Sequence, residues 1–353
     1  MSPAFQLHDS AIFCAPLRDG FPDWLGRQRY SRIAVVADSN TRALCLPVLL
    51  EQTGLPAADL YIVEIPAGET HKTLSTCEKV WSGMLAAQLD RKALVINLGG
   101  GVVGDLGGFC AATFKRGIDF VQAPTTLLSM TDAAIGGKTG IDFQGIKNTI
   151  GVFQQPKAVF ADPVFLQTLP RRELLSGFAE VIKHALIGAP ELLEQIERTE
   201  QLSVADCQAY LPASIGVKVR VVAEDPLEKG LRALLNFGHT IGHALESYWL
   251  DSTDPLTHGE AVAAGMICET WLASGDRAYT QKVCGLIGRF FPHRIIPETA
   301  FPRLWQMMQQ DKKNAAGAVR IAVPNPDQPF DLHLVEPTRE AVEQSFRMYN
   351  SLV

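Results

Sequence analysis

The first half of the chain alternates short apolar runs with longer segments of mixed character. Apolar runs with the length of a buried strand occur at 33–37, 60–65, 93–98, 120–123 and 158–161. Helical or turn segments of about 10 to 20 residues separate these runs, which is long enough for crossover helices. The pattern therefore predicts a mostly parallel sheet with helices between its strands.

From about residue 169 the apolar residues recur with the period of a helix. Helices are expected at 171–187, 204–222, 232–250, 259–274, 277–290 and 337–350. One hairpin is expected in this half, between 319–323 and 330–334, with its turn in PNPDQP. We predict an N-terminal α/β, Rossmann-like dinucleotide-binding domain at residues 1–165. An all-helical metal-binding domain is expected to follow at residues 166–353.

Composition narrows the class of protein. The chain has 353 residues, enough for two domains with their own cores, and its net charge of -6 gives no reason to expect a nucleic-acid partner. We find no apolar run of membrane-spanning length and no signal-peptide pattern at the start. The seven cysteines are scattered singly. This usage argues against a disulfide framework and predicts a cytoplasmic location.

A glycine-rich turn suggests a dinucleotide. Residues 99–104, GGGVVG, fit the pattern GxGxxG, follow the run 93–98 and open a helical segment. Such glycines let a pyrophosphate approach the backbone at a helix N-terminus. The motif alone is weak, because Pro124 stands where an acidic ribose-binding residue is expected, and a plain strand-to-helix turn is the alternative. Asp38 ends an earlier strand and could hold a ribose instead. Glu69 and Lys72 follow the next strand, and successive strand ends form a ligand crevice in open α/β sheets.

Several cationic residues lie in polar, mostly glycine-rich loops. Lys138 lies in AIGGKTG and Lys147 in GIKNT, with Asp132 and Asn148 beside them, and KRG supplies Arg116. An ammonium group is a compact charge suited to phosphate or carboxylate, and glycines bring backbone amides within reach. Solvated loop charges are the alternative. In an acidic chain, this concentration of cations favours an anionic ligand.

Three histidines lie close together in the sequence, at His239, His243 and His258. Neutral imidazole is a good zinc ligand, and the i, i+4 spacing by itself favours His239 and His243 as the pair of ligands. Glu180, on a predicted helix, could complete the site. Two histidines and one carboxylate leave an open coordination position, which is the arrangement of a catalytic metal.

Taken together, the motifs resemble those of 3-dehydroquinate synthases. The segments that carry the resemblance are PAGETHKT, NLGGGVVGDLGGFCAATFKRG, APTTLLSMTDAAIGGKTG, GIKNTIGVFQQP, ELLSGFAEVIKHALI, LNFGHTIGHALE, HGEAVAAGM and QDKKN. They follow the family's order from about Asp38 to Val323. The resemblance implies a homodimer that binds NAD on an α/β domain and a divalent metal, zinc or cobalt, on a helical domain.

The resemblance also implies roles for individual residues. The metal ligands would be Glu180, His239 and His258, which replaces the pair favoured by spacing and puts His243 in the substrate site. The NAD contacts would be Asp38, Glu69, Lys72, Gly100, Gly101, Val102, Asp105, Thr125 and Thr126, with Lys138 and Lys147 beside the cofactor. The catalytic set would be His243, Lys138, Asn148, Arg116 and Glu228. The further substrate contacts would be Asp132, Lys147, Lys183, Lys218, Arg232, Asn236 and Lys312, the last chosen over its neighbour Lys313.

The implied reaction converts 3-deoxy-D-arabino-heptulosonate 7-phosphate to 3-dehydroquinate and phosphate. A hydroxyl is transiently oxidised by NAD, phosphate is eliminated, the hydride returns, and an intramolecular aldol step closes the ring. The enzyme is therefore a carbon–oxygen lyase. Ala133 and Ala134 stand where many family members have serines, and Gly140 where alanine is common. These small-for-small changes lie beside the retained Asp132 and Lys138, and we expect little effect from them.

Three other functions remain as alternatives. A sister cyclase would act on glucose 6-phosphate or sedoheptulose 7-phosphate, but KRG, GGKTG, IKN and GHTIGH all keep the dehydroquinate pattern. A metal-dependent polyol dehydrogenase would release NADH, and it does not explain the dense set of cations. A non-catalytic NAD-sensing protein would not need the metal ligands and substrate lysines.

Overall fold

The computed structural model describes residues 2–144, 146–274, 277–310 and 318–352. By their internal contacts the residues form two compact units. The first consists of Met1–Pro170 and Cys207–Val219, and the second of Arg171–Asp206 and Arg220–Val353. The sequence predicted a division at residue 165. It did not predict that part of helix α8 (Val204–Glu224) would group with the first unit.

The first unit is built on a seven-stranded sheet in the order β1-β2-β9-β6-β5-β3-β4. Its strands are β1 (Phe5–Leu7), β2 (Ser10–Phe13), β3 (Ile33–Asp38), β4 (Leu60–Ile65), β5 (Leu94–Gly99), β6 (Asp119–Pro124) and β9 (Ala158–Phe160). Only the edge pair β1–β2 is antiparallel. The five predicted parallel strands are confirmed. The edge pair was missed because three or four residues show too little alternation to read.

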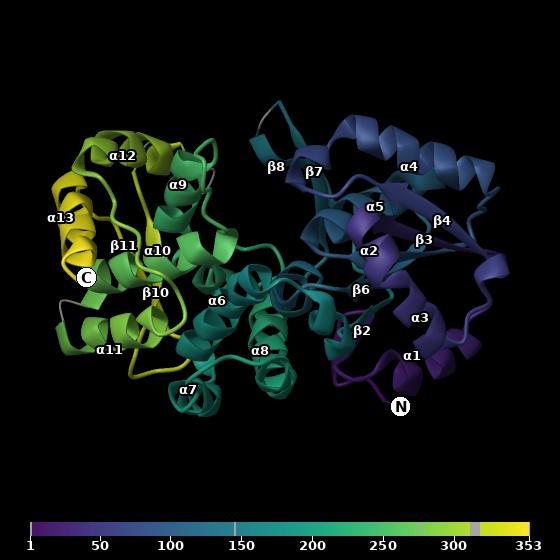
Figure 1. Cartoon of the computed structure of the whole chain (residues 1–353), viewed down its shortest axis with the longest axis horizontal. Coiled ribbons are helices and arrows are strands. Elements are labelled where there is room, and N and C mark those ends of the chain that lie inside the picture. Colours follow the sequence, from purple (N-terminus) through teal and green to yellow (C-terminus); the bar gives the residue numbers. More distant parts are fainter. Residues whose placement is uncertain (1, 145, 275–276, 311–317, 353) are drawn as a thin grey trace. The chain divides into compact units, whose positions relative to one another are not determined.

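Helices cover both faces of this sheet, as a parallel sheet requires. They are α1 (Leu17–Gly26), α2 (Ser39–Leu44), α3 (Leu46–Thr53), α4 (Leu74–Ala86) and α5 (Gly101–Thr113). The helices α4 and α5 lie on one face, where Val80, Met84 and Leu106 join the strand residues Val36 and Val95 in one core (Figure 1). On the other face, Phe21 of α1 packs edge-on against Phe160 of β9, with ring centres 5.0 Å apart.

The order of the strands creates a switch point between β3 and β5. From β3 the chain passes to β4 at one edge, and from β5 it passes through β6 to β9 on the other side. The neighbouring carboxyl ends of β3 and β5 carry Asp38 and the turn Gly99–Gly101. In open α/β sheets, ligands bind at this kind of position.

The segments expected as cationic loops form a β-hairpin. Strands β7 (Lys138–Phe143) and β8 (Ile146–Phe153) pair antiparallel, so Lys138, Lys147 and Asn148 lie on strands and not on loops. The glycines that suggested a loop instead let the two backbones approach. A Cβ atom on Gly140 would lie 2.5 Å from the carbonyl oxygen of Ile150.

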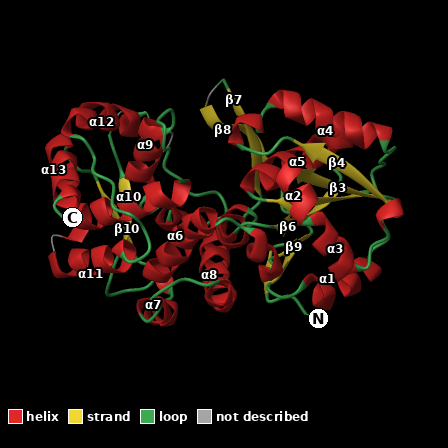
Figure 2. Ribbon diagram, in the orientation of Figure 1, coloured by secondary structure: helices red, strands yellow, loops and turns green. Residues whose placement is uncertain are grey.

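The second unit is mainly helical, with one small sheet (Figure 2). It contains α6 (Arg171–Gly188), α7 (Pro190–Glu197), α9 (His239–Trp249), α10 (His258–Ser274), α11 (Arg277–Gly288), α12 (Phe301–Gln309) and α13 (Arg339–Asn350). The predicted hairpin is confirmed as β10 (Ile321–Pro324) with β11 (Leu332–Val335). The predicted helix 232–250 is broken at Gly238, whose φ of 78° ends one helical segment before α9 begins. Helices α7 and α12 were not predicted.

Short helical turns complete both units. They are Ala57–Asp59, Glu69–His71, Phe114–Arg116, Ser129–Ala133, Pro163–Thr168, Leu231–Asn236 and Glu298–Ala300.

Three helices of the second unit meet at glycines. Helix α10 packs against both α6 and α9. A Cβ atom on Gly265 would lie 2.0 Å from the carbonyl oxygen of Gly238, and one on Gly259 would lie 2.1 Å from that of Ser176. These distances are far below a van der Waals contact. The helices therefore lie closer together than any side chain at these positions would permit.

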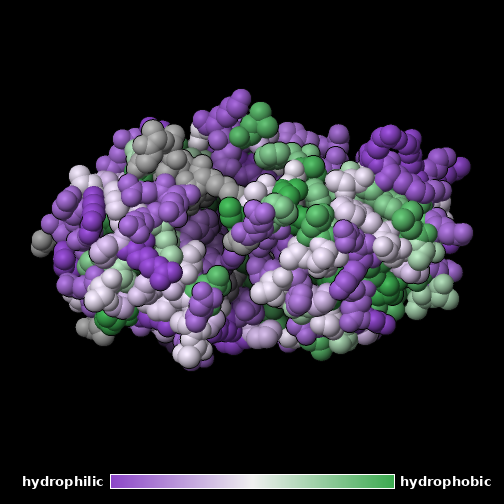
Figure 3. Space-filling view, turned by 90° about the horizontal axis from the view of Figure 1, so that it is seen from above, coloured by the Kyte–Doolittle hydropathy of each residue, from purple (hydrophilic) through white to green (hydrophobic). Residues whose placement is uncertain are grey.

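The surface is largely polar on the face shown in Figure 3, with hydrophobic side chains in scattered groups. The exposed hydrophobic residues include Phe143, Ile146 and Phe153 of the β7–β8 hairpin. Among the residues that the structure describes, no helix combines the length and apolar character needed to cross a membrane.

We predict that Gly265→Ala lowers the free energy of unfolding by about 1–3 kcal/mol, because the methyl group overpacks the α9–α10 contact. Chemical denaturation would measure the change. Gly285→Ala on α11 is the matched control, since a Cβ atom there meets nothing within 4 Å. The control should be neutral or stabilising by up to about 1 kcal/mol. Equal stability of the two variants would contradict the close contact.

Candidate functional site

A potential metal centre lies inside the second unit. Glu180 of α6, His239 at the start of α9 and His258 at the start of α10 offer ligand atoms that all lie within 4.8 Å of one another. The Nε2 atoms of His239 and His258 are 3.6 and 3.7 Å from Oε1 of Glu180. Around a tetrahedral zinc ion, with ligands at about 2.0–2.1 Å, neighbouring ligand atoms are about 3.4 Å apart. The donor set and its spacing therefore fit a divalent metal.

Hydrogen bonds fix the beginning of α10 and hence the place of His258. The Glu260 carboxylate accepts the N–H of Thr257 at 2.8 Å, and the Thr257 hydroxyl accepts the N–H of Glu260 at 3.3 Å. This is a capping box, visible in the sequence as THGE. Arg172 of α6 donates to both oxygens of Glu260, each at 2.8 Å. The N-terminus of α10 is thereby attached to the helix that carries Glu180.

A second contact sets the same register. The N–H of Gly259 donates to Oγ of Ser176 at 3.0 Å, at the place where the two backbones come closest. Ser176 lies one turn before Glu180 on α6. His258 and Glu180 are therefore brought together by the contact between Gly259 and Ser176.

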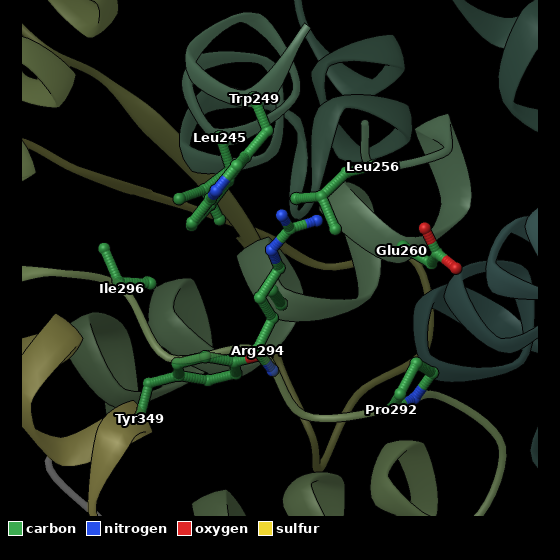
Figure 4. Close-up of a pocket in the computed structure, with 9 residues that line it drawn as sticks. Leu245, Trp249, Leu256, Glu260, Pro292, Arg294, Ile296 and Tyr349 are labelled. Carbon is green, nitrogen blue, oxygen red and sulfur yellow. The ribbon is translucent and has the colours of Figure 1, made fainter. Parts of the chain in front are cut away.

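Arg294 lines a pocket beside the N-terminus of α10 and helps to hold the segment that precedes this helix (Figure 4). The guanidinium of Arg294 lies 4.7 Å from the ring centre of Trp249 and donates to the carbonyl oxygen of Asp254 at 2.6 Å. Arg172 contacts the side chain of the same Asp254 at 3.2 Å and the carbonyl oxygen of Pro255 at 2.8 Å. Two arginines thus hold the segment that leads into His258.

The start of α9 is held by a carboxylate from α10. Gly238 gives this helix no side-chain cap of its own. Instead, the buried carboxylate of Glu269 accepts the N–H groups of Gly238 at 2.6 Å and Ile241 at 2.9 Å. A negative charge at a helix N-terminus is favourable. Glu269 therefore fixes the position of His239, the first residue of α9.

The other ring nitrogen of each histidine is also engaged. Nδ1 of His239 lies 3.1 Å from the carbonyl oxygen of Phe237, and Nδ1 of His258 lies 3.2 Å from Oε2 of Glu246. Burial disfavours the charged form of His258, yet its interactions with Glu180 and Glu246 outweigh burial and raise its pKa to about 9. Glu180 and Glu246 therefore give this ring negatively charged surroundings.

Other predicted site residues surround the three ligands. The ring of His243 is centred 5.2 Å from that of His239 and 6.1 Å from that of His258. Lys183, with its side chain 1% exposed, pairs with Glu180 and donates to the carbonyl oxygen of Leu235 at 2.7 Å. The three histidines therefore lie close together. The ligand atoms of His239 and His258 are the ones that converge with the carboxylate of Glu180.

A polar loop in the same unit holds three more of the predicted residues. Asn236 donates to Oε1 of Glu228 at 2.9 Å, and Arg232 donates to the carbonyl oxygen of Pro226 at 2.7 Å. The loop is shaped by Asp225, whose carboxylate accepts the N–H groups of Lys229, Gly230 and Arg232. These hydrogen bonds, led by that of Lys229, lower the pKa of Asp225.

In the first unit, the glycine-rich turn has the close packing of a dinucleotide site. Helix α5 begins at Gly101 without a side-chain cap, and its first amides have no acceptor within the helix. A Cβ atom on Gly100 would lie 3.0 Å from the methyl carbon of Thr126, and one on Gly104 would lie 3.2 Å from Gln122. The N–H of Thr125 donates to the carbonyl oxygen of Gly99 at 3.0 Å. The N–H groups at the start of α5, including that of Val102, suit an anion.

Asp38 has a local role that the sequence did not reveal. Its carboxylate accepts the N–H groups of Asn40 and Thr41 at 2.9 and 2.8 Å, so it caps α2. Asp38 ends β3, beside the switch point, and its contact with a ribose stays a prediction.

Four predicted residues meet in a charged cluster. Nζ of Lys72 lies 2.6 Å from Asp105, 2.5 Å from Oδ1 of Asn148 and 3.9 Å from Glu69. Burial opposes the charge of Lys72, but the attraction of Asp105 and Glu69 outweighs it and raises the lysine's pKa. Burial raises the pKa of Asp105 to about 6, although Lys72 works against this.

Sequence reasoning missed Asp142, which joins this cluster. Its Oδ1 accepts the N–H of Asn148 at 2.8 Å, and its own N–H donates to the carbonyl oxygen of Lys72 at 2.9 Å. Asn148 has a φ of 51°, an uncommon backbone conformation that this hydrogen bond supports. The contact depends on the register of the hairpin, which no local pattern shows.

The remaining predicted residues are more scattered. Lys218 donates to Asp132 at 2.5 Å, and both belong to the first unit. Lys138 and Lys147 are exposed on the hairpin. Arg116 is exposed beyond the far end of α5, about 20 Å along the helix from Gly101, so the structure does not bring it to the turn. Lys312 and its alternative Lys313 lie outside the described residues.

We predict that His258→Ala loses the bound metal, because it removes one of three converging ligands. His243→Ala, the matched control on the same cluster, should retain metal and lose most of its turnover. Metal analysis of the purified variants, together with activity, would measure both effects. The reverse result would restore His239 and His243 as the ligand pair.

The chain matches known proteins over most of its length. A family model described as 3-dehydroquinate synthase N-terminal matches residues 62–176, and one described as 3-dehydroquinate synthase C-terminal matches residues 177–314. The 3-dehydroquinate synthase of Parabacteroides distasonis is 37% identical over 325 residues, which cover 88% of this chain and 90% of that protein. The enzyme of the same name from Halorhodospira halophila is 44% identical over 293 residues, covering 78% and 80% of the two chains.

Solved structures share the fold. A 2-deoxy-scyllo-inosose synthase complexed with carbaglucose-6-phosphate, NAD+ and Co2+ superposes with a TM-score of 0.80 at 23% identity, covering 95% of each chain. The 2-epi-5-epi-valiolone synthase of Streptomyces hygroscopicus subsp. jinggangensis, with NAD+ and Zn2+ bound, has a TM-score of 0.81 at 25% identity. It covers 99% of this chain and 98% of that one. From the family models and the relatives together, the chain belongs to the 3-dehydroquinate synthase family.

Proposed function

We propose that this chain is an enzyme that converts 3-deoxy-D-arabino-heptulosonate 7-phosphate to 3-dehydroquinate and phosphate, a step of the shikimate pathway. Membership of the family supports this reaction, and two relatives over most of the chain carry the enzyme's name. The structural observation that carries the proposal is the convergence of Glu180, His239 and His258 into a three-ligand set.

The reaction uses NAD and a divalent metal. When bound, NAD accepts and later returns a hydride, while the metal polarises the substrate carbon that loses it. Cofactors of these kinds are present in two solved relatives, with Co2+ in one and Zn2+ in the other. The metal would be held by Glu180, His239 and His258. NAD would be held by residues at or after the carboxyl ends of β3, β4, β5 and β6: Asp38, Glu69, Lys72, Gly100, Gly101, Val102, Asp105, Thr125 and Thr126.

Residues of the first unit would bind anionic groups. The amides of the first turn of α5 are oriented to take a pyrophosphate. The ammonium groups of Lys138 and Lys147 are suited to the substrate's phosphate or carboxylate. Asn148, next to Lys147 on β8, is held by Asp142. Positive groups around a leaving phosphate offset its growing charge, which lowers the barrier to elimination.

Residues of the second unit would orient the sugar. Lys183 and His243 lie beside the ligand set, and we assign Arg232 and Asn236 to the same role. Glu228 accepts a hydrogen bond from Asn236. We assign Asp132, Lys218 and Lys312 to substrate binding as well. A ketone formed next to the reacting C–H makes that proton acidic, and an oxygen of the substrate's own phosphate takes it as the phosphate leaves. Many contacts are needed because one site must retain several intermediates.

We further propose that the chain works as a homodimer in the cytoplasm. The family resemblance supports the dimer. All seven cysteines carry free thiols, which suits a reducing compartment. The partner in the reaction is a small sugar phosphate.

Incubation with NAD, zinc and the seven-carbon keto-acid phosphate tests the function. We expect phosphate and 3-dehydroquinate in equal amounts without accumulation of NADH, because the hydride returns to the product. Phosphate assay, product chromatography and absorbance at the NADH band would be followed together. Net NADH would identify a dehydrogenase. Turnover only with glucose 6-phosphate or sedoheptulose 7-phosphate would identify a sister cyclase.

Removal of the metal should abolish turnover. A chelator is expected to inactivate the enzyme, and added zinc or cobalt is expected to restore activity, because either ion suits a site with one carboxylate and two histidines. Circular dichroism before and after chelation serves as the control for unfolding. Full activity in protein shown by elemental analysis to be metal-free would refute the metal-dependent mechanism.

A further inference from the structure

We propose that Glu246 is a positioning residue of the metal centre. Its carboxylate holds the imidazole of His258 in the orientation that binds the ion, and its negative charge strengthens metal binding. The inference rests on the proposed function, since it concerns the same ligand set. It adds a residue that is not a ligand and that was not among the residues predicted from the sequence.

The first support is the placement of Glu246 on α9. It follows His239 by seven residues and His243 by three, so all three lie on one face of the helix. Its side chain is 14% exposed, and Oε2 lies 3.2 Å from Nδ1 of His258. Helix α9 therefore contributes one ligand directly and supports the ligand of the next helix through Glu246.

The second support is the chemistry of imidazole. A histidine binds a metal through one nitrogen only when the proton is on the other, and a carboxylate that accepts this proton's hydrogen bond fixes the tautomer and the ring orientation. With Nδ1 of His258 facing Glu246, its Nε2 faces Glu180 at 3.7 Å. His239 is oriented in the same way by the main-chain carbonyl of Phe237. The support of His258 is a side chain, so mutation can remove it.

The third support is the balance of charge. The buried ligand Glu180 pairs with Lys183, which offsets part of its negative charge. With two neutral imidazoles, Glu180 alone would leave a divalent ion poorly compensated. Glu246 adds a second carboxylate against the ring of His258, and at 14% exposure its charge is only partly screened by solvent. Its charge should therefore matter in addition to its hydrogen bond.

Titration of the metal-free protein with zinc, against a chelator of known affinity, tests the proposal without relying on turnover. Glu246→Ala is expected to weaken zinc binding by about 10- to 100-fold, the usual effect of removing such a support. Glu246→Gln keeps an acceptor for Nδ1–H but removes the charge, so its affinity should fall between those of Glu246→Ala and the unmodified chain. The visible spectrum of bound cobalt should shift in Glu246→Ala, because the ring is no longer held.

Glu343→Gln is the matched control. Glu343 lies on α13 of the same unit, is 21% exposed and pairs with Arg339, so its loss reports any general effect of removing a half-buried carboxylate. The control should bind zinc as the unmodified chain does. Unchanged affinity in Glu246→Ala, or an equal loss in the control, would overturn the inference. Failure of the unmodified chain to bind zinc would instead refute the proposed metal site, and the inference with it.

Discussion

The close approach of α6, α9 and α10 is the constraint on which the chemistry of the second unit depends. Backbone meets backbone at Gly259 and Gly265, where a Cβ atom would lie 2.1 and 2.0 Å from a carbonyl oxygen. This approach brings the first residues of two helices to Glu180 on the third. Because the three candidate ligands come from three helices, binding of a metal and packing of the helices should stabilise each other.

Two carboxylates, Glu269 fully buried and Glu260 partly exposed, fix the positions of the histidines within this packing. Glu269 caps α9 in front of His239, and Glu260 caps α10 around His258, where it is also held by Arg172. A buried charge is costly unless it is paired or hydrogen-bonded, and these carboxylates meet that requirement at helix N-termini. The same groups that stabilise the helix ends therefore position His239 and His258.

In the first unit, the candidate binding residues are positioned by the ends of parallel strands. The reversal of strand order between β3 and β5 places Asp38 beside the glycine-rich turn. The β7–β8 hairpin then adds Asn148, which reaches Lys72 and is itself held by Asp142. Polar groups from distant segments thus gather without a continuous motif, because the sheet and the hairpin bring their ends into contact.

The sequence by itself determined the parallel strands, most helices of the second unit and the family, because apolar period and motif order are local properties. It also indicated a metal, and the resemblance, not the spacing, named His258 as a ligand. Spacing favoured His243 because it reports contacts within one helix only. Tertiary structure decided which histidines converge with Glu180, that the lysine-bearing segments form a hairpin, and that Glu246 lies against His258 and Asp142 against Asn148. These contacts join residues on different elements, so they depend on the packing of helices and the register of strands.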